Sequence, residues 1–329
     1  MKRIPPGLAL LLLAPLLGEL VSGHMGPAEF FNPLAFVIMA LPYGFGAVLV
    51  RELLIRWDKR WPSLVLLGLA YGVYEEAIVV RSIFNADWHE LTPGVSYGYV
   101  GGVHAGYGLM LLHFHLVVSI GASILLAHVL YRERRKQPWL GRGMLVACAA
   151  GLLLWLPVGW LLTDYRPPVL HYVMAWLVLL TLVIAARFAP NQLVAVEPRQ
   201  APRARWFFVL GCVNVTTVFI GLGYALENGT PPFPLVFTIL VLLNVACLTL
   251  LVHWSGEGRT WRDSQRLAWI AGTLAFFIVF GATQDAEQWQ GKSLVSLVAA
   301  VALWRLSRRI RRRERLDAAG EADVAPEQV

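Results

Sequence analysis

The chain has 329 residues, of which 57% are hydrophobic and 15% are charged. Soluble domains carry about 25% charged residues, so the composition excludes an ordinary soluble protein and indicates a membrane protein. The formal net charge of +7 lies mostly in short segments between apolar runs. It therefore predicts contact with membrane lipids and no nucleic-acid partner.

Ten apolar runs are long enough to be membrane-spanning helices, which need roughly 20 residues each. They are rich in Leu, Val and Ala, and they lack the alternating polarity, about ten residues long, of transmembrane β-barrel strands. We expect an all-α fold, a polytopic transmembrane bundle of about ten helices. In chain order the predicted helices are 7–22, 34–55, 62–81, 104–130, 141–162, 168–188, 206–226, 233–254, 266–286 and 290–306.

The basic residues predict the orientation of this bundle. If both termini are cytoplasmic, only Arg81, Arg166 and Lys292 of the 28 Lys and Arg residues fall in outer segments. Cytoplasmic loops of membrane proteins carry an excess of Lys and Arg, so we expect both termini in the cytoplasm. The first run has features of a signal peptide, but Glu19 occupies the place of a cleavage region, which favours an uncleaved helix.

The loops divide the chain into four parts. A front half of six helices (1–188) carries most of the intramembrane polar residues, and a Pro-rich cytoplasmic linker (189–205) follows. A back half of four helices (206–307) leads to a tail (308–329) that is first basic and then acidic, and that we expect to be disordered. All three cysteines fall inside predicted helices, so no structural disulfide is expected.

Two adjacent carboxylates, Glu75 and Glu76, interrupt the third apolar run. In the predicted orientation they lie roughly 10–12 Å below the outer interface, and His113 and His115 of the next helix lie deeper. Ionisable groups at such depths are costly and rarely face lipid, so we expect them to border the bundle interior. His115 shares a helical stripe with Ser119 and two other small residues, which makes it the inward-facing histidine.

These residues suggest three functions. In the leading hypothesis, a Glu/His hydrolase-like enzyme acts on a lipid-like or peptide substrate at an outward-opening site. Glu75 or Glu76 is the base, His115 its partner and Arg81 a charge clamp. The alternatives are a proton- or cation-coupled carrier and a non-catalytic membrane assembly factor. No metal-ligand spacing such as H-E-x-x-H occurs, so no metal or cofactor is expected, and the sequence specifies no oligomeric state.

Each of these residues also has a purely structural explanation. The two glutamates could be half-solvated beside Arg81. Arg51 and Glu52, at the inner end of the second helix, could form a local ion pair. An ordinary hydrated interface is the favoured interpretation of the remaining polar residues near the outer surface, namely Glu19, Glu29, Asp87 and His89.

Two resemblances to known families follow from particular stretches. Glu75-Glu76-x4-Arg81 resembles the first motif of the CAAX-protease and bacteriocin-processing family of intramembrane peptidases, which implies Glu75 as base and Arg81 as helper. The spacing is one residue longer than in that family, and its later F-x-x-x-H and H-x-x-x-N/D motifs are absent. Residues 14–90, including "APLLGELVSG" and "WPSLVLLGLAYGVYEE", resemble a group of uncharacterised bacterial multi-pass membrane proteins. That resemblance implies a bacterial plasma (inner) membrane and supplies no activity.

Overall fold

The computed structural model describes residues 4–88, 91, 97–193, 201–285 and 289–324, and it is helical at all ten predicted positions. The front half contains α1 (Pro6–Pro15), η1 (Leu16–Val21), α2 (Pro27–Phe30), α3 (Pro33–Arg56), α4 (Trp61–Val73), η2 (Tyr74–Val79), η3 (Ser82–Phe84), β1 (Tyr99–Val100), β2 (Val103–His104), α5 (Ala105–Phe114), η4 (His115–Ala122), α6 (Ser123–Leu130), η5 (Arg132–Arg134), α7 (Arg142–Leu162) and α8 (Val169–Phe188). The back half contains α9 (Ala204–Asn228), α10 (Phe233–Trp254), α11 (Asp263–Gly281) and α12 (Lys292–Val324).

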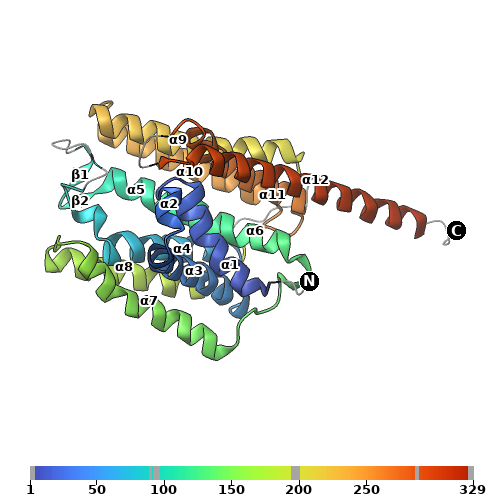
Figure 1. Ribbon diagram of the computed structural model, residues 1–329, viewed down its shortest axis with the longest axis horizontal. Coiled ribbons are helices and arrows are strands. Elements are labelled where there is room, and N and C mark those ends of the chain that lie inside the picture. Colours follow the sequence, from blue (N-terminus) through green and yellow to red (C-terminus); the bar gives the residue numbers. More distant parts are fainter. Residues whose placement is uncertain (1–3, 89–90, 92–96, 194–200, 286–288, 325–329) are drawn as a thin grey trace.

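The predicted polytopic helix bundle is confirmed. Within the described residues, eight helices are long and apolar enough to cross a membrane by length and composition. The first helix, Pro6–Val21, is also apolar but is shorter than these eight helices. Helix α12 has 33 residues and is apolar only in its first half. Helix α1 begins and α12 ends at the same end of the bundle, as an even number of crossings requires (Figure 1).

We call that end the basic end, because the loops 57–60, 131–141 and 255–262 and the basic stretch 305–315 lie there. The opposite end carries the short hairpin of β1 and β2, in which Tyr99 pairs with His104. Which end faces the cytoplasm stays a prediction from the positive-inside rule.

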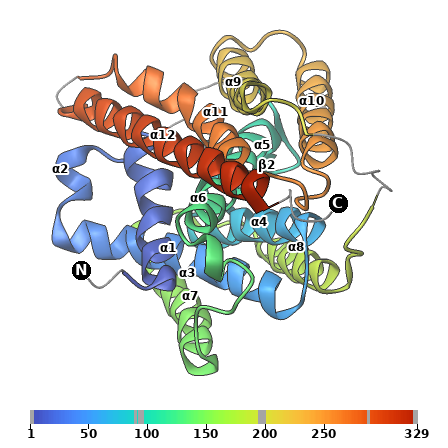
Figure 2. The same ribbon diagram turned by 90° about the vertical axis from the view of Figure 1, so that its right-hand side faces the viewer.

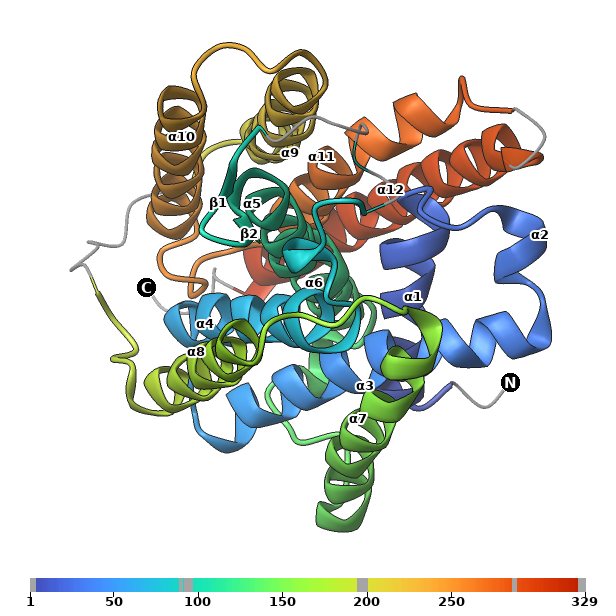
Figure 3. The same ribbon diagram turned by 90° about the vertical axis from the view of Figure 1, so that its left-hand side faces the viewer.

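Two helices occupy the centre of the bundle. One is Trp61–Val79, formed by α4 and η2, in which 78% of the residues in the most apolar stretch are buried inside the protein. The other is Ala105–Leu130, formed by α5, η4 and α6, in which 72% of such residues are buried. In Val169–Phe188, on the periphery of the bundle, only 11% of the residues in the apolar stretch are buried. Views from the two ends show α4 and α5–α6 surrounded by the other helices (Figures 2 and 3). The two predicted halves meet where α11 packs against η4 and α6.

Three of the inner segments are π-helical: η1, η2 and η4. Their backbone hydrogen bonds span five residues, as between Val80 N and Glu75 O at 2.8 Å and between Ser22 N and Leu17 O at 3.3 Å. Such widened turns are rare and occur frequently at functional sites. All three lie in the front half, which the sequence already marks as the polar one.

The basic tail continues as helix where the sequence predicts disorder. Helix α12 runs as far as Val324, and residues 325–329 lie outside the described part of the chain. Arg313 and Glu314 contact the start of α11, through the Asp263 carboxylate and the Ser264 amide, and Asp317 pairs with Arg132 at 2.9 Å. These contacts hold the tail helix against two loops of the basic end. Of the predicted linker, residues 194–200 are outside the described residues.

Helices α9 and α11 cross with their backbones in contact. A Cβ atom at Gly272 would lie 2.1 Å from the carbonyl oxygen of Phe208, and one at Gly211 would lie 2.6 Å from that of Trp269. Backbone atoms cannot move aside as side chains do, so glycine is required at this crossing.

Gly272→Ala is therefore expected to lower the free energy of unfolding by about 1–3 kcal/mol, the usual cost of overpacking an interior. Gly223→Ala in α9 is the matched control, because a Cβ atom there meets nothing within 4 Å. Thermal unfolding in detergent measures both variants. Equal stability of the two would contradict a close α9–α11 crossing.

Candidate functional site

The two central helices are joined by a contact between Glu76 and His115. His115 Nε2 lies 2.8 Å from Glu76 Oε1, and the Ser82 hydroxyl donates to Glu76 Oε2. Glu76 is 8% exposed and His115 is 1% exposed. The contact occupies Nε2 of the imidazole, so any second hydrogen bond of His115 has to use Nδ1. Within the described residues, Nδ1 is buried and has no hydrogen-bond partner.

Two further carboxyl groups lie beside this pair. Glu75 accepts a hydrogen bond from the Tyr71 hydroxyl at 3.4 Å, and it interacts electrostatically with Glu76 and Glu19. Glu19 is 4% exposed, hydrogen-bonds to Tyr43, and is close enough to interact with the charge of Glu76. We call these residues, Glu19, Glu75, Glu76 and His115 with Tyr43 and Tyr71, the acid cluster.

The burial of Glu19 corrects the sequence analysis, in which an ordinary hydrated interface was favoured for it. Glu29 and Asp87 are exposed, as that interpretation expects, and His89 lies outside the described residues. The clue missed in the sequence was the position of Glu19 within the first apolar run, three residues before its end. A carboxylate there is costly unless protein surrounds it.

Aromatic rings enclose the imidazole of His115. The ring centroids of Tyr71 and Phe114 lie 5.5 Å from that of His115, and the centroid of Tyr43 lies 5.8 Å away. Glycines make room for these rings, since a Cβ at Gly46 would lie 2.1 Å from the Tyr71 ring. The acid cluster is therefore held in a tightly packed, largely apolar environment.

The π-helical segments supply the three glutamates and the histidine of the acid cluster. Glu19 lies in η1, Glu75 and Glu76 in η2, and His115 in η4. A π-helical turn rotates successive side chains by less than an α-helical turn does, which allows neighbouring residues to share one side. His113, two residues earlier in α5, is also buried, but no hydrogen bond links it to the acid cluster among the described residues.

Arg81, the fourth predicted site residue, contacts neither glutamate through its hydrogen bonds. It is fully buried, and its guanidinium stacks over the Trp160 ring at 4.5 Å. Its bonds run to oxygen atoms at the end of α7 and in nearby turns: the carbonyls of Val79, Gly159, Thr163 and Tyr165 and the Thr163 hydroxyl. The geometry therefore gives Arg81 the role of a cap on the last carbonyls of α7.

The polar side of η4 continues toward the basic end. Ser119 and Ser123 follow His115 at intervals of four residues, and both are fully buried. Serine and threonine inside helices often donate to the carbonyl four residues earlier, as Thr217 and Thr249 do here. The hydroxyls of Ser119 and Ser123 have no such partner within the described residues.

A second buried charged group lies at the basic end. Arg51 and Glu52 form an ion pair with both side chains fully buried. Arg51 also donates to Gln137 O at 2.7 Å, and Glu52 accepts from Trp139 N at 2.8 Å. The predicted local ion pair thus also fastens the 131–141 segment to α3. His128 Nε2 lies 3.5 Å from Arg51 Nε.

Lys292 is a positioning residue that the sequence analysis did not single out. It is 1% exposed, and its Nζ donates to Leu20 O at 2.6 Å and to Val21 O at 2.9 Å. These are carbonyls of η1, the segment that carries Glu19. A lone lysine at the start of the last apolar run was the available signal.

The bundle of apolar helices around an ionisable interior defines a multi-pass α-helical membrane protein. A model of a family described as an uncharacterized membrane protein family matches residues 8–310, and the chain belongs to that family. This match confirms the resemblance predicted from residues 14–90 and extends it over most of the chain. No curated protein and no solved structure matches the chain. The resemblance to the CAAX-protease family is not shown by these comparisons.

Replacing Arg81 tests its capping role. Arg81→Gln is expected to lower the free energy of unfolding by about 2–3 kcal/mol, because buried carbonyl groups lose charged donors. Arg142→Gln is the control, since Arg142 is exposed in the first turn of the same helix, far from its last carbonyls, and its loss should cost less than about 0.5 kcal/mol. Chemical unfolding in detergent compares the two variants. A stability loss no larger than that of the control would rule out the cap.

Proposed function

We propose that this membrane protein transfers protons through the acid cluster, as the proton-coupling part of a carrier. The observation that carries the proposal is the buried contact of Glu76 with His115, at the head of a stripe of unpartnered serine hydroxyls on the same helix. Chains of Glu and His side chains are the usual proton relays of membrane transporters.

The charge balance of the acid cluster supports proton storage. Three carboxyl groups lie together, and among the described residues no Lys or Arg side chain bonds to them. Several negative charges in a water-poor interior repel one another and lose their hydration, which makes exchange of a proton between them a means of relieving the repulsion. A group of carboxyls that share protons can accept one and release one with little structural change.

The proposed path of the protons runs from the acid cluster toward the basic end, along the side of η4 and α6 that carries His115, Ser119 and Ser123. From His115 to His128 the helix extends about 20 Å at 1.5 Å per residue, more than half of a hydrocarbon core about 30 Å thick. Ser119 and Ser123 lie along the first part of this distance, and small, fully buried side chains, Ala47 and Ala127, belong to the surrounding core. Small and hydroxyl-bearing side chains leave the least obstruction to a file of water molecules.

Hydrolysis of a lipid-like or peptide substrate is the second candidate. It is favoured by the unpartnered Nδ1 of His115, because a carboxylate-bound imidazole with one unused nitrogen is a general base. Against it, the aromatic rings of Tyr43, Tyr71 and Phe114 occupy the space around the imidazole where a scissile bond would have to lie.

Proton flux into proteoliposomes tests the first proposal. The purified protein is reconstituted with a pH-sensitive dye inside the vesicles, and a potassium gradient with valinomycin sets the membrane potential. The unmodified protein is expected to acidify the lumen. Glu76→Gln should reduce the rate to that of protein-free vesicles, whereas Glu227→Gln, an exposed carboxylate in α9, should leave it unchanged. Flux that persists in Glu76→Gln would refute the relay.

The double variant Ser119→Ala/Ser123→Ala separates the two candidates. A relay through the stripe predicts a marked loss of proton flux, because methyl groups cannot pass protons. Hydrolysis at Glu76 and His115 predicts unchanged activity toward labelled lipids or peptides, since neither serine bonds to the pair. Full proton flux in this variant, with the fold intact by size exclusion and thermal unfolding, would count against the proposed path.

A further inference from the structure

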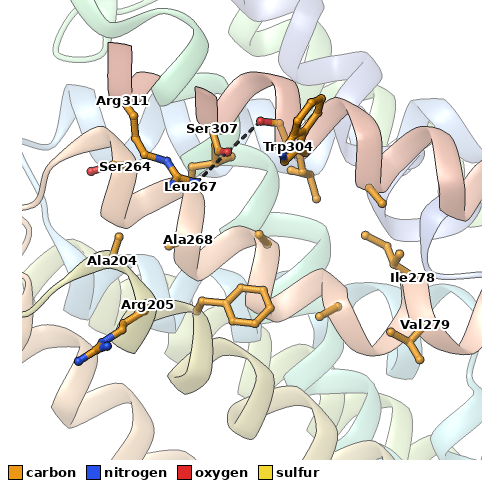
Figure 4. A pocket seen from close by; sticks show the side chains of 15 residues that line it. Ala204, Arg205, Ser264, Leu267, Ala268, Ile278, Val279, Trp304, Ser307 and Arg311 are labelled. Atoms are coloured by element: carbon orange, nitrogen blue, oxygen red, sulfur yellow. Dashed lines mark hydrogen bonds between the residues drawn. The ribbon is translucent and has the colours of Figure 1, made fainter. Parts of the chain in front are cut away.

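A groove lies between α9, α11 and α12, away from the acid cluster. It has a volume of about 520 Å³, and most of its lining is apolar: leucine, isoleucine, valine, phenylalanine and alanine side chains of the three helices. Small side chains on α11, including Ala271, form part of its wall, and Ala268 is visible there (Figure 4). The close approach of α9 and α11 at Gly272 fixes two of the three walls.

The polar lining residues gather at one end of the groove. Arg205 lies at the start of α9, Ser264 at the start of α11, and Ser307 and Arg311 in the basic part of α12. Ile278 and Val279 lie toward the other end (Figure 4). The groove is therefore amphipathic along its length, with its cationic mouth at the basic end of the bundle.

Neither arginine of the mouth is neutralised by an ion pair within the described residues. Arg311 donates to the Ser307 hydroxyl at 3.2 Å, and that hydroxyl donates to Trp304 O at 2.8 Å (Figure 4). Arg205 stacks over Trp206 with 5.4 Å between the guanidinium carbon and the ring centroid. Both arginines are exposed. Asp263 and Glu314 nearby are already bound, to Arg313 and to the Ser264 amide respectively.

We propose that this groove binds one anionic phospholipid, with the phosphate between Arg205 and Arg311 and an acyl chain along α11. From Ser264 to Val279 the groove follows α11 for about 22 Å, enough to cover one leaflet of hydrocarbon, about 15 Å deep. The positive mouth matches a negative head group at the level where head groups lie. The apolar lining matches the chain. A soluble anion would satisfy the arginines but would leave the apolar walls uncovered.

The inference does not depend on proton transfer. It rests on the α9–α11–α12 groove, whereas the proposed relay lies on η1, η2 and η4, so each can fail without the other. It also gives the basic part of α12 a specific task beyond general attraction to anionic membranes.

Native mass spectrometry of the purified protein tests the site, with phosphatidylglycerol and phosphatidylcholine of identical chains added in turn. The unmodified protein is expected to retain one phosphatidylglycerol in preference to phosphatidylcholine. Arg205→Gln/Arg311→Gln should weaken the binding of phosphatidylglycerol roughly thirtyfold, the effect of about 1 kcal/mol for each charge at 1.4 kcal/mol per tenfold change. Arg308→Gln/Arg312→Gln is the matched control, because both residues are on α12 but do not line the groove.

Equal losses in the two double variants would overturn the site, since they would indicate attraction to the whole basic helix. Absence of any preference for phosphatidylglycerol over phosphatidylcholine would overturn it as well. A photoactivatable phosphatidylglycerol with the reactive group on its acyl chain supplies an independent readout without substitution. Cross-links to α9, α11 or α12 at the groove are expected. Cross-links elsewhere, or recovery of a second copy of the chain in the groove, would refute lipid occupancy.

Discussion

The position of Glu76 against His115 is the constraint on which the centre of the molecule depends. The contact joins the two most buried helices, and each partner would be costly in hydrocarbon without the other. Glu19 and Glu75 bring further carboxyl groups to the same place with tyrosine hydroxyls as partners. An interior arranged only for stability would not assemble three acids there, because an apolar core of the same shape is at least as stable.

Three buried ionic groups of the bundle differ in a way that separates structure from function. Arg51 and Glu52 balance each other and bind backbone atoms of one loop, and Arg56 lies 3.4 Å from the second carboxylate oxygen of Glu52. Arg81 is likewise surrounded by carbonyl oxygens that match its donors. In the acid cluster, acidic groups outnumber basic ones, and His115 keeps an unused nitrogen. Charged groups whose charge and hydrogen bonds are matched by neighbours hold segments of the fold together. A group with excess acidic side chains and an unused nitrogen can still exchange protons.

The sequence predicted the helices well and the site in part. The length of each apolar run determines a membrane helix directly, and the cost of burying Glu76 and His115 predicts that they face protein. The contribution of Glu19 depends on how α1 packs against α3, which a single sequence does not encode locally. The π-helical turns are also set by packing. Arg81 has a left-handed backbone conformation, φ 65°, and its hydrogen bonds go to carbonyls near the end of α7, a contact that the sequence does not indicate.

The bond from Lys292 to the carbonyls of η1 ties the last helix to the first. During synthesis the chain inserts in order, so the segment carrying Glu19 enters the bilayer long before the residue that fixes its end has been translated. Until α12 arrives, η1 can pack against η4 and α11 but lacks the lysine that binds its last carbonyls. Assembly of the ionisable centre is thereby coupled to completion of the polypeptide, and a prematurely terminated product would be left with a loosened, incomplete interior.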